Sequence, residues 1–201
     1  AEANADMAYT LFVPTSYDAK TPMPLIVDLH GLNITPLQQI LFDGTTDFAA
    51  RYGFIVLAPT GFNLVAGWGA RTGTPVETAQ VKPGSDQRYS ASELSELDGM
   101  TALKLIGEKY NVDSDRIFLM GHPLGGAGTY YLGGKYNDIW PRLAPPPGAG
   151  GRADATAAGR ATALPVQTMH GAKDATVPGD TPRRAPPAPD APPAAPAPPP
   201  E

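Results

Sequence analysis

The chain contains no cysteine, which excludes disulfide bonds and thiolate catalysis from the functions open to it. Without cysteine, the composition does not indicate whether the protein works in an oxidising or a reducing compartment. Histidine is scarce as well, with three residues in a chain of 201. A function that needs a histidine base or several histidine ligands therefore has few residues to draw on.

The chain also has few basic residues and no long hydrophobic run. Fifteen basic residues stand against 20 acidic ones, which gives a net charge of −5. Nucleic acids and anionic membranes favour a basic surface, so we expect neither as a partner. No apolar run approaches the ~18 residues of a membrane-spanning helix, and no signal peptide opens the chain. The first residues, 1–4, are compatible with a mature end left by signal cleavage.

The remaining composition is that of a globular domain with an unusual tail. Hydrophobic residues make up 42% and charged residues 17% of the chain, whose length suits one domain with one substantial core. Within residues 181–201, 16 of 21 residues are proline or alanine, and ten of them are proline. Because proline lacks the backbone N–H that helices and central strands require, we expect a polyproline-like or irregular segment there. The predicted organisation is a domain at 1–180 followed by the tail.

Short apolar runs bounded by proline or glycine predict five strands, at residues 9–13, 24–29, 54–58, 116–120 and 164–169. Helical spacing predicts helices at 37–52, at 92–110 and from Leu124 onward, with Gly44 weakening the first and Ser92 able to cap the second. Residues 60–90 are rich in glycine and turn residues and are expected to form a long surface loop. Buried strands that alternate with amphipathic helices predict an α/β fold with a mainly parallel sheet covered on both faces.

Three of the expected strands end in a histidine beside a glycine: His30-Gly31, Gly121-His122 and His170-Gly171. Active sites in parallel α/β sheets lie at the carboxyl ends of the strands. The same edge of the sheet is therefore the predicted site.

The second of these strands, at 116–120, runs into the sequence G-H-P-L-G-G at 121–126 and then into a helix. This is the layout of a nucleophile elbow, G-x-S-x-G, with Pro123 in place of serine. Further blocks match in the same order: L-H-G at 29–31, G-F-I-V at 53–56, Trp68, Asp98, V-D at 112–113 with Arg116, and H-G at 170–171 with Asp174. From about residue 9 to 178 the chain thus resembles the esterase family of polyhydroxybutyrate depolymerases and feruloyl or acetylxylan esterases.

The resemblance implies the α/β-hydrolase fold and a secreted carboxylic ester hydrolase that works through a serine acyl-enzyme without a cofactor. Its substrate would be a small-molecule or polymeric ester. Residue by residue, Pro123 takes the nucleophile position and Asp174 the acid that orients the catalytic histidine. The backbone N–H groups of Leu32 and Leu124 would form the oxyanion hole.

The catalytic histidine itself is not identified. In this fold it should follow Asp174, but that part of the chain is the proline-rich tail. His30, His122 and His170 belong to other motifs of the family and are expected to be structural hydrogen-bonding residues, so we expect no metal site. The serines lie outside a glycine-flanked turn after a buried strand, and we reject them as nucleophiles: Ser85, Ser90, Ser92, Ser95 and Ser114.

For Trp68 and for the acidic start of the helix at 92–110, a structural interpretation stands beside a functional one. Trp68 is predicted to line the substrate cleft, with the anchoring of the long loop as an equal alternative. Glu93, Glu96 and Asp98 are most simply interpreted as the solvated acidic start of a helix.

Three accounts of Pro123 remain open: a working esterase whose sequence is misreported at 123 and in the tail, a pseudoenzyme that binds on an esterase scaffold, and an engineered or truncated form. We favour the first, because one cause then covers both anomalies; it would also place a packed helix at 183–191. Residue 123 provides a test, since an elbow nucleophile has a strained, positive φ whereas proline is held near −65°.

Overall fold

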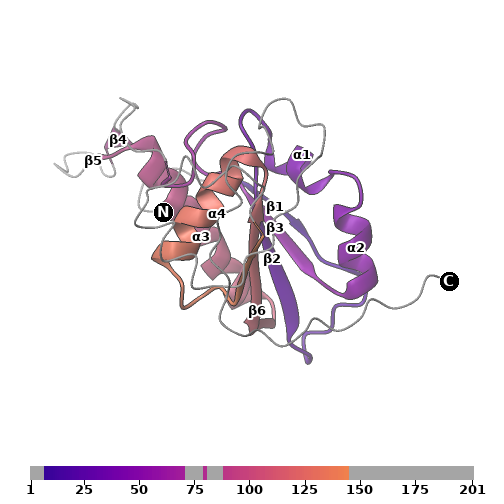
Figure 1. The fold of residues 1–201 in the computed structure, drawn as a ribbon. Coiled ribbons are helices and arrows are strands. Elements are labelled where there is room, and N and C mark those ends of the chain that lie inside the picture. The colour runs from indigo at the N-terminus through magenta and orange to yellow at the C-terminus, as the bar shows by residue number, and fades with distance from the viewer. Residues whose placement is uncertain (1–6, 71–78, 81–87, 145–201) are drawn as a thin grey trace, which may run out of the picture.

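The computed structural model describes residues 7–70, 79–80 and 88–144. The strand predicted at 164–169 and the tail at 181–201 lie outside the described residues. Within them, a five-stranded sheet has α1 and α2 on one face and α3 and α4 on the other (Figure 1). This arrangement confirms the predicted α/β architecture.

The strand order in the sheet is β1-β3-β2-β6-β7. The strands are β1 (Tyr9–Phe12), β2 (Met23–Leu29), β3 (Ile55–Pro59), β6 (Val112–Gly121) and β7 (Arg142–Ala144). β1 pairs antiparallel with β3, and the other pairings are parallel. Four predicted strands are thus confirmed, and β7 is an addition. Every residue of β3 is buried, because helices cover both faces of the sheet at this strand.

The single helix predicted at 37–52 is wrong, because the segment forms two helices, α1 (Pro36–Ile40) and α2 (Thr45–Tyr52). A capping box between Thr35 and Gln38 begins α1. Gly44 precedes α2 with a φ of 87°, a left-handed conformation that interrupts a helix and that glycine adopts at little cost. The glycine that weakened the prediction is the residue at which the chain turns.

On the other face lie α3 (Ala91–Lys109) and α4 (Pro123–Lys135). The cap of α3 is Ser90, not Ser92: Ser90 Oγ accepts from the Glu93 N–H at 3.2 Å, and Glu93 Oε2 accepts from the Ser90 N–H at 2.7 Å. Ser92, two residues further along, is buried. The expected loop at 60–90 contains a two-stranded ribbon, β4 (Ala79–Gln80) and β5 (Arg88–Tyr89).

The main core lies between the sheet and the helices α3 and α4. Its fully buried members include alternate residues of β2, one strand residue on either side and two tryptophans: Leu25, Val27, Leu29, Leu57, Leu119, Trp68 and Trp140. A smaller cluster of Ile40, Ala49, Val56 and Ala58 lies under α1 and α2. No helix in the described part of the chain is long and apolar enough to cross a membrane.

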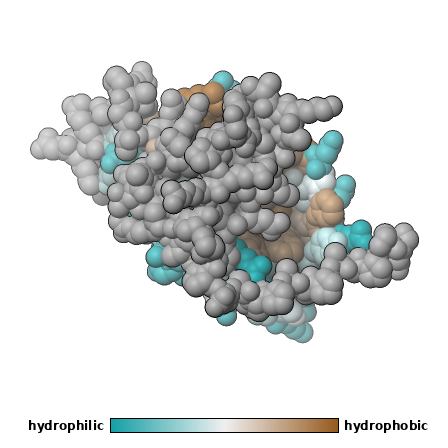
Figure 2. All heavy atoms as spheres, viewed as in Figure 1, coloured by the Kyte–Doolittle hydropathy of each residue, from teal (hydrophilic) through white to brown (hydrophobic). Residues whose placement is uncertain are grey.

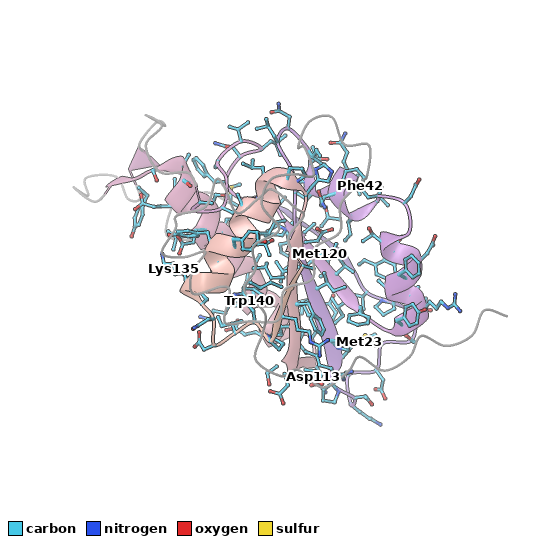
Figure 3. The ribbon with its side chains drawn as sticks, in the orientation of Figure 1. Met23, Phe42, Asp113, Met120, Lys135 and Trp140 are labelled. Carbon is cyan, nitrogen blue, oxygen red and sulfur yellow. The ribbon has the colours of Figure 1, made fainter. Side chains whose placement is uncertain are left out.

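Apolar side chains are also exposed on the α1 and α2 side, where Figure 2 shows hydrophobic surface beside α2. The large apolar residues exposed there come from both helices and their connection: Leu37, Leu41, Phe42, Phe48 and Tyr52. Phe42 lies at the carboxyl-end edge of the sheet, whereas Met23 and Asp113 mark the opposite edge (Figure 3).

Candidate active site

The carboxyl ends of β2 and β6 meet at one edge of the sheet, as predicted. Leu29, the last residue of β2, is in register with Gly121, the last residue of β6. The His122 N–H donates to the Leu29 carbonyl at 3.0 Å, which holds the two strand exits together. His30-Gly31 and Gly121-His122 are therefore neighbours, and His170 lies outside the described residues.

Glycine is required in the turn after β6 because α4 begins in direct contact with β2. A Cβ at Gly125 would lie 2.0 Å from the Leu29 carbonyl oxygen, and one at Gly121 would lie 2.6 Å from the Gly125 carbonyl carbon. Backbone atoms cannot move aside as a flexible side chain can, so neither position accepts a larger residue. This is the tight strand-to-helix turn that the glycine spacing predicts.

Pro123 is the first residue of α4 and is exposed to solvent. His122 caps the helix in an extended conformation, with a φ of −76°. Among the described non-glycine residues, positive φ values occur at Asn33, Phe62 and Trp68, so Pro123 does not have the strained conformation of an elbow nucleophile. The first helical position suits proline, whose fixed φ matches the helix. The backbone angle at 123 is therefore that expected for a true proline.

The two predicted oxyanion residues lie just after β2 and β6, Leu32 in a loop and Leu124 in the first turn of α4. The Leu124 N–H is in the first turn of α4, where a helix offers no acceptor, and its side chain is buried. Leu32 is 54% exposed. Its loop is folded by two bonds, from the Asn33 N–H to the Leu64 carbonyl at 2.9 Å and from the Ile34 N–H to the Gly31 carbonyl at 3.3 Å. Their oxyanion role stays a prediction, and Asp174 lies outside the described residues.

His30 is buried and ties two loops together. Its Nδ1 lies 2.8 Å from the Gly31 carbonyl oxygen, and its Nε2 lies 2.8 Å from the Thr60 carbonyl oxygen. Both ring nitrogens are thus engaged with backbone, in agreement with a structural role. His122 is exposed, and its ring lies 5.2 Å from that of Phe42. Its Nδ1 would be 2.6 Å from a Cβ on Gly31, so the imidazole rests against the loop that follows β2.

Trp68 is only 1% exposed and lies beneath the site. Its Nε1–H donates to the His30 carbonyl at 3.3 Å, and its ring meets the His30 ring edge-on with 4.9 Å between centroids. Its backbone N–H donates to Ser95 Oγ at 3.2 Å. Gly128 of α4 approaches it so closely that a Cβ there would lie 2.4 Å from the Trp68 Cβ. This position fits the anchoring alternative, since the side chain is enclosed by the core.

The interpretation of Glu96 and Asp98 as a solvated helix start is wrong. Asp98 accepts from the Gly61 N–H at 2.7 Å, and burial raises the pKa of its carboxyl although backbone donors of the loop at 60–62 lower it. Asp98 therefore holds the loop that follows β3. The sequence prediction missed this role because a carboxylate two turns into a helix can equally lie on a solvated face or bind a neighbouring loop, and the sequence does not distinguish the two.

Glu96 is 4% exposed and connects α3 to α4. Its carboxylate accepts from Lys135 Nζ at 2.6 Å, from the Tyr136 hydroxyl at 2.5 Å and from the Tyr131 hydroxyl at 3.2 Å. Burial and, second, the Glu96 carboxylate raise the pKa of Tyr136 to about 12. Burial alone would lower the pKa of Lys135, but the hydrogen bond and charge of Glu96 raise it above its ordinary value. Figure 3 shows Lys135 on α4.

Replacement of Glu96 by alanine is expected to lower the free energy of unfolding by about 2–3 kcal/mol, because three donors lose a charged acceptor. Urea denaturation measures this loss. Glu108→Ala on the same helix is the control: Glu108 is 62% exposed and its partner Lys104 lies 3.8 Å away, so the expected change is below about 0.5 kcal/mol. Equal effects of the two variants would contradict a structural role of the buried network.

Among the described residues, no group of three histidine or acidic side chains is placed to hold a metal ion.

No family model and no curated protein matches the chain. Solved structures do match. A thermostable esterase has a TM-score of 0.64 at 20% identity, over 89% of this chain and 46% of that one. An acetyl xylan esterase from Aspergillus awamori has a TM-score of 0.61 at 15% identity, over 89% of this chain and 72% of that one. An S-formylglutathione hydrolase from Staphylococcus aureus has a TM-score of 0.53 at 16% identity, over 73% of this chain and 53% of that one.

The chain spans about half the length of two of these three structures. At such identities the likeness is one of fold. The mainly parallel sheet with helices on both faces is the fold that the chain shares with them.

Proposed function

We propose that this chain, whose fold is that of the α/β-hydrolases, is a carboxylic ester hydrolase in architecture, with residue 123 at the position of the nucleophile. The observation that carries the proposal is the contact of Gly125 with the end of β2, where a Cβ would lie 2.0 Å from the Leu29 carbonyl oxygen. Such an approach aligns the first turn of α4 with the loop that contains Leu32. With this alignment, we expect a residue at 123 to stand beside both proposed oxyanion donors.

In the proposed reaction, a serine oxygen at 123 attacks the ester carbonyl carbon while a histidine takes the hydroxyl proton. The negative charge on the carbonyl oxygen is held by the N–H groups of Leu32 and Leu124, each worth about 3 kcal/mol. The alcohol leaves with the proton, and water releases the acid in a second attack. Asp174 would orient the histidine. Proline has no hydroxyl, so the acyl bond does not form in the chain with Pro123.

The exposed apolar residues beside the site support an ester with an apolar portion. Leu32 and Phe42 are 54% and 41% exposed, and the His122 ring lies against Gly31, the residue before Leu32, with its centroid 5.2 Å from that of the tilted Phe42 ring. Val65, 40% exposed, follows Leu64, whose carbonyl accepts from Asn33 of the Leu32 loop. Polyester, feruloyl and acetyl-xylan esters all present such a portion.

Introduction of the missing hydroxyl tests the nucleophile position. Pro123→Ser is expected to gain one phosphonyl group at residue 123 from a fluorophosphonate probe, located by peptide mass spectrometry, whereas the chain with Pro123 stays unlabelled. Labelling should be slow, because loss of the catalytic histidine costs a serine hydrolase about 10⁶ in rate.

The matched control is Pro36→Ser, which places a serine at the first position of α1 instead. We expect no label on it, because α1 follows the loop at 30–35 and not a glycine-flanked turn that directly leaves a buried strand. Absence of label from both variants would refute the assignment of residue 123. Label on the chain with Pro123 would move the nucleophile elsewhere.

A second function, ester binding without turnover, is favoured by one observation: Pro123 begins a regular helix and lacks the strained φ of a nucleophile. Hexanoate, a carboxylate with an apolar chain, is a suitable probe because its oxygens accept from the same N–H groups as an oxyanion. Binding should shift the amide resonances of Leu32 and Leu124 and leave that of Gly107 unchanged. The intact mass of the natural protein separates this function from that of an active enzyme with serine at 123.

A further inference from the structure

Asp28 is a fully buried carboxyl group in the middle of the sheet. Its neighbours in β2, Val27 and Leu29, point into the main core, so Asp28 points to the opposite face, toward α1. There the Gln39 Nε2–H donates to Asp28 Oδ1 at 2.9 Å. Asp28 Oδ2 and Gln39 Oε1 are both buried and have no donor within the described residues.

A single proton accounts for both unsatisfied oxygens. An ionised carboxylate and an amide oxygen are acceptors only, so neither can satisfy the other. A neutral carboxylic acid can donate its O–H to the amide oxygen while it accepts the amide N–H. The planar acid and the planar amide then form two antiparallel hydrogen bonds, and no buried acceptor stays without a partner.

We propose that folding keeps Asp28 as a neutral acid that donates its proton to Gln39 Oε1, and that this pair is a pH-dependent latch positioning α1 and the loop at 30–35. The latch is a property of the fold. Its effect on catalysis rests on the proposed function, because the loop contains Leu32.

The electrostatic surroundings favour the neutral form. Burial raises the pKa of Asp28 to about 7, against the smaller lowering by the Gln39 hydrogen bond. α1 and β3 contain no ionisable side chain. Asp28 is in register with Met120, whereas the ionisable residues of β6 lie at the far end of that strand. The ionisable residues of β6 and of the other elements around Asp28 are partly or largely exposed: Tyr9, Asp43, Asp47, Arg51, Tyr52, Asp113, Asp115 and Arg116. His30 is engaged with the carbonyls of Gly31 and Thr60.

The latch is a large part of what attaches α1. This helix has five residues, too few to be stable alone, and its buried residues are Gln39 and Ile40. The chain between Asp28 and Gln39 includes the whole loop at 30–35. Ionisation of Asp28 would leave a buried anion facing the Gln39 amide oxygen, which weakens the attachment at the end of that loop.

The sign of the pH dependence follows from proton linkage. A folded pKa above the unfolded value of about 3.9 means that the folded state binds more protons between the two values. Stability from the latch is therefore full below about pH 4 and decreases as the pH rises to about 7. One linked proton lowers the folding equilibrium constant by about tenfold per pH unit in this window.

Asp28→Asn provides the test, because asparagine keeps the shape and presents a permanent N–H donor to Gln39 Oε1. The ratio of the folding constant of the natural chain to that of D28N, from urea denaturation between pH 4 and 8.5, is expected to fall by about tenfold per unit up to about pH 7 and then to level off. The control is Asp43→Asn, at an exposed position, whose profile should run parallel to that of the natural chain. Parallel profiles of the natural chain and D28N would overturn the latch.

A second measurement needs no variant and covers the case in which D28N does not fold. The carboxyl ¹³C resonance of Asp28 in the natural chain should titrate with a midpoint near 7, accompanied by shifts of the amide resonances at 30–34. A midpoint near 4 would refute the neutral acid, and unchanged amides would refute the positioning of the loop. Neither readout uses activity, so failure of the phosphonate experiment at residue 123 leaves this result standing.

Discussion

Alanine at position 125 is expected to destabilise the protein by at least about 3 kcal/mol, because its Cβ would lie 2.0 Å from the Leu29 carbonyl oxygen and 2.6 Å from the carbonyl carbon. Rotation of a side chain cannot relieve a contact between a Cβ and backbone. α4 would have to move away from β2, which also separates the loops at the candidate site. Urea denaturation of Gly125→Ala measures the loss.

Gly107→Ala is the matched control, since Gly107 lies inside α3 and a Cβ there would meet nothing within 4 Å. The same substitution should stabilise the protein by about 0.5–1 kcal/mol at this position, because alanine loses less backbone entropy in a helix. Opposite signs for the two variants distinguish a close approach of backbones from the general effect of glycine. A small loss for Gly125→Ala would show that α4 does not pack against the end of β2.

Truncation of Trp68 to alanine is expected to cost about 3–5 kcal/mol of unfolding free energy, the range for loss of a large buried aromatic side chain. The side chain is 1% exposed and packs between His30 and the close glycine of α4, Gly128. Its removal leaves a cavity beneath the candidate site. Thermal or urea unfolding gives the value.

Trp68→Phe separates the ring from its hydrogen bond. Phenylalanine keeps much of the packing and loses the 3.3 Å bond from Nε1–H to the His30 carbonyl, so a loss of about 1–2 kcal/mol is expected. If Trp68 instead lined the substrate cleft, Trp68→Ala would change stability by no more than about 0.5 kcal/mol and would weaken hexanoate binding. The two roles therefore differ in which measurement responds.

The two glycines of the turn after β6 show what the sequence determines about the candidate site. Gly121 and Gly125 flank a turn whose geometry depends on residues close in the chain and on one buried strand end, and both could be recognised by spacing. β2, β3 and the apolar end of β6 were predictable for a related reason, since strands covered on both faces are apolar at nearly every position. The local sequence pattern is sufficient to predict a strand where the residues of that strand are buried at nearly every position.

Pairing and burial between distant segments were decided by the tertiary structure. The ion pair of Glu96 with Lys135 and the bond from the Gly61 N–H to Asp98 join residues 37 or more positions apart. The neighbouring residues in the chain therefore gave no sign that these carboxylates are not solvated. β7 is a strand of three residues, too short for a periodic signal, and exists because the edge of β6 offers it hydrogen bonds.

Position 123 and Asp28 mark the boundary between the two kinds of information. The amino acid at 123 determines by itself that no serine hydroxyl is present and that φ cannot be positive, since the proline ring restricts that angle wherever it lies. That Asp28 meets an amide rather than water is decided only when α1 closes over the sheet. A proton's position depends on burial and on partners that the fold brings together, and the order of residues in the chain does not specify these.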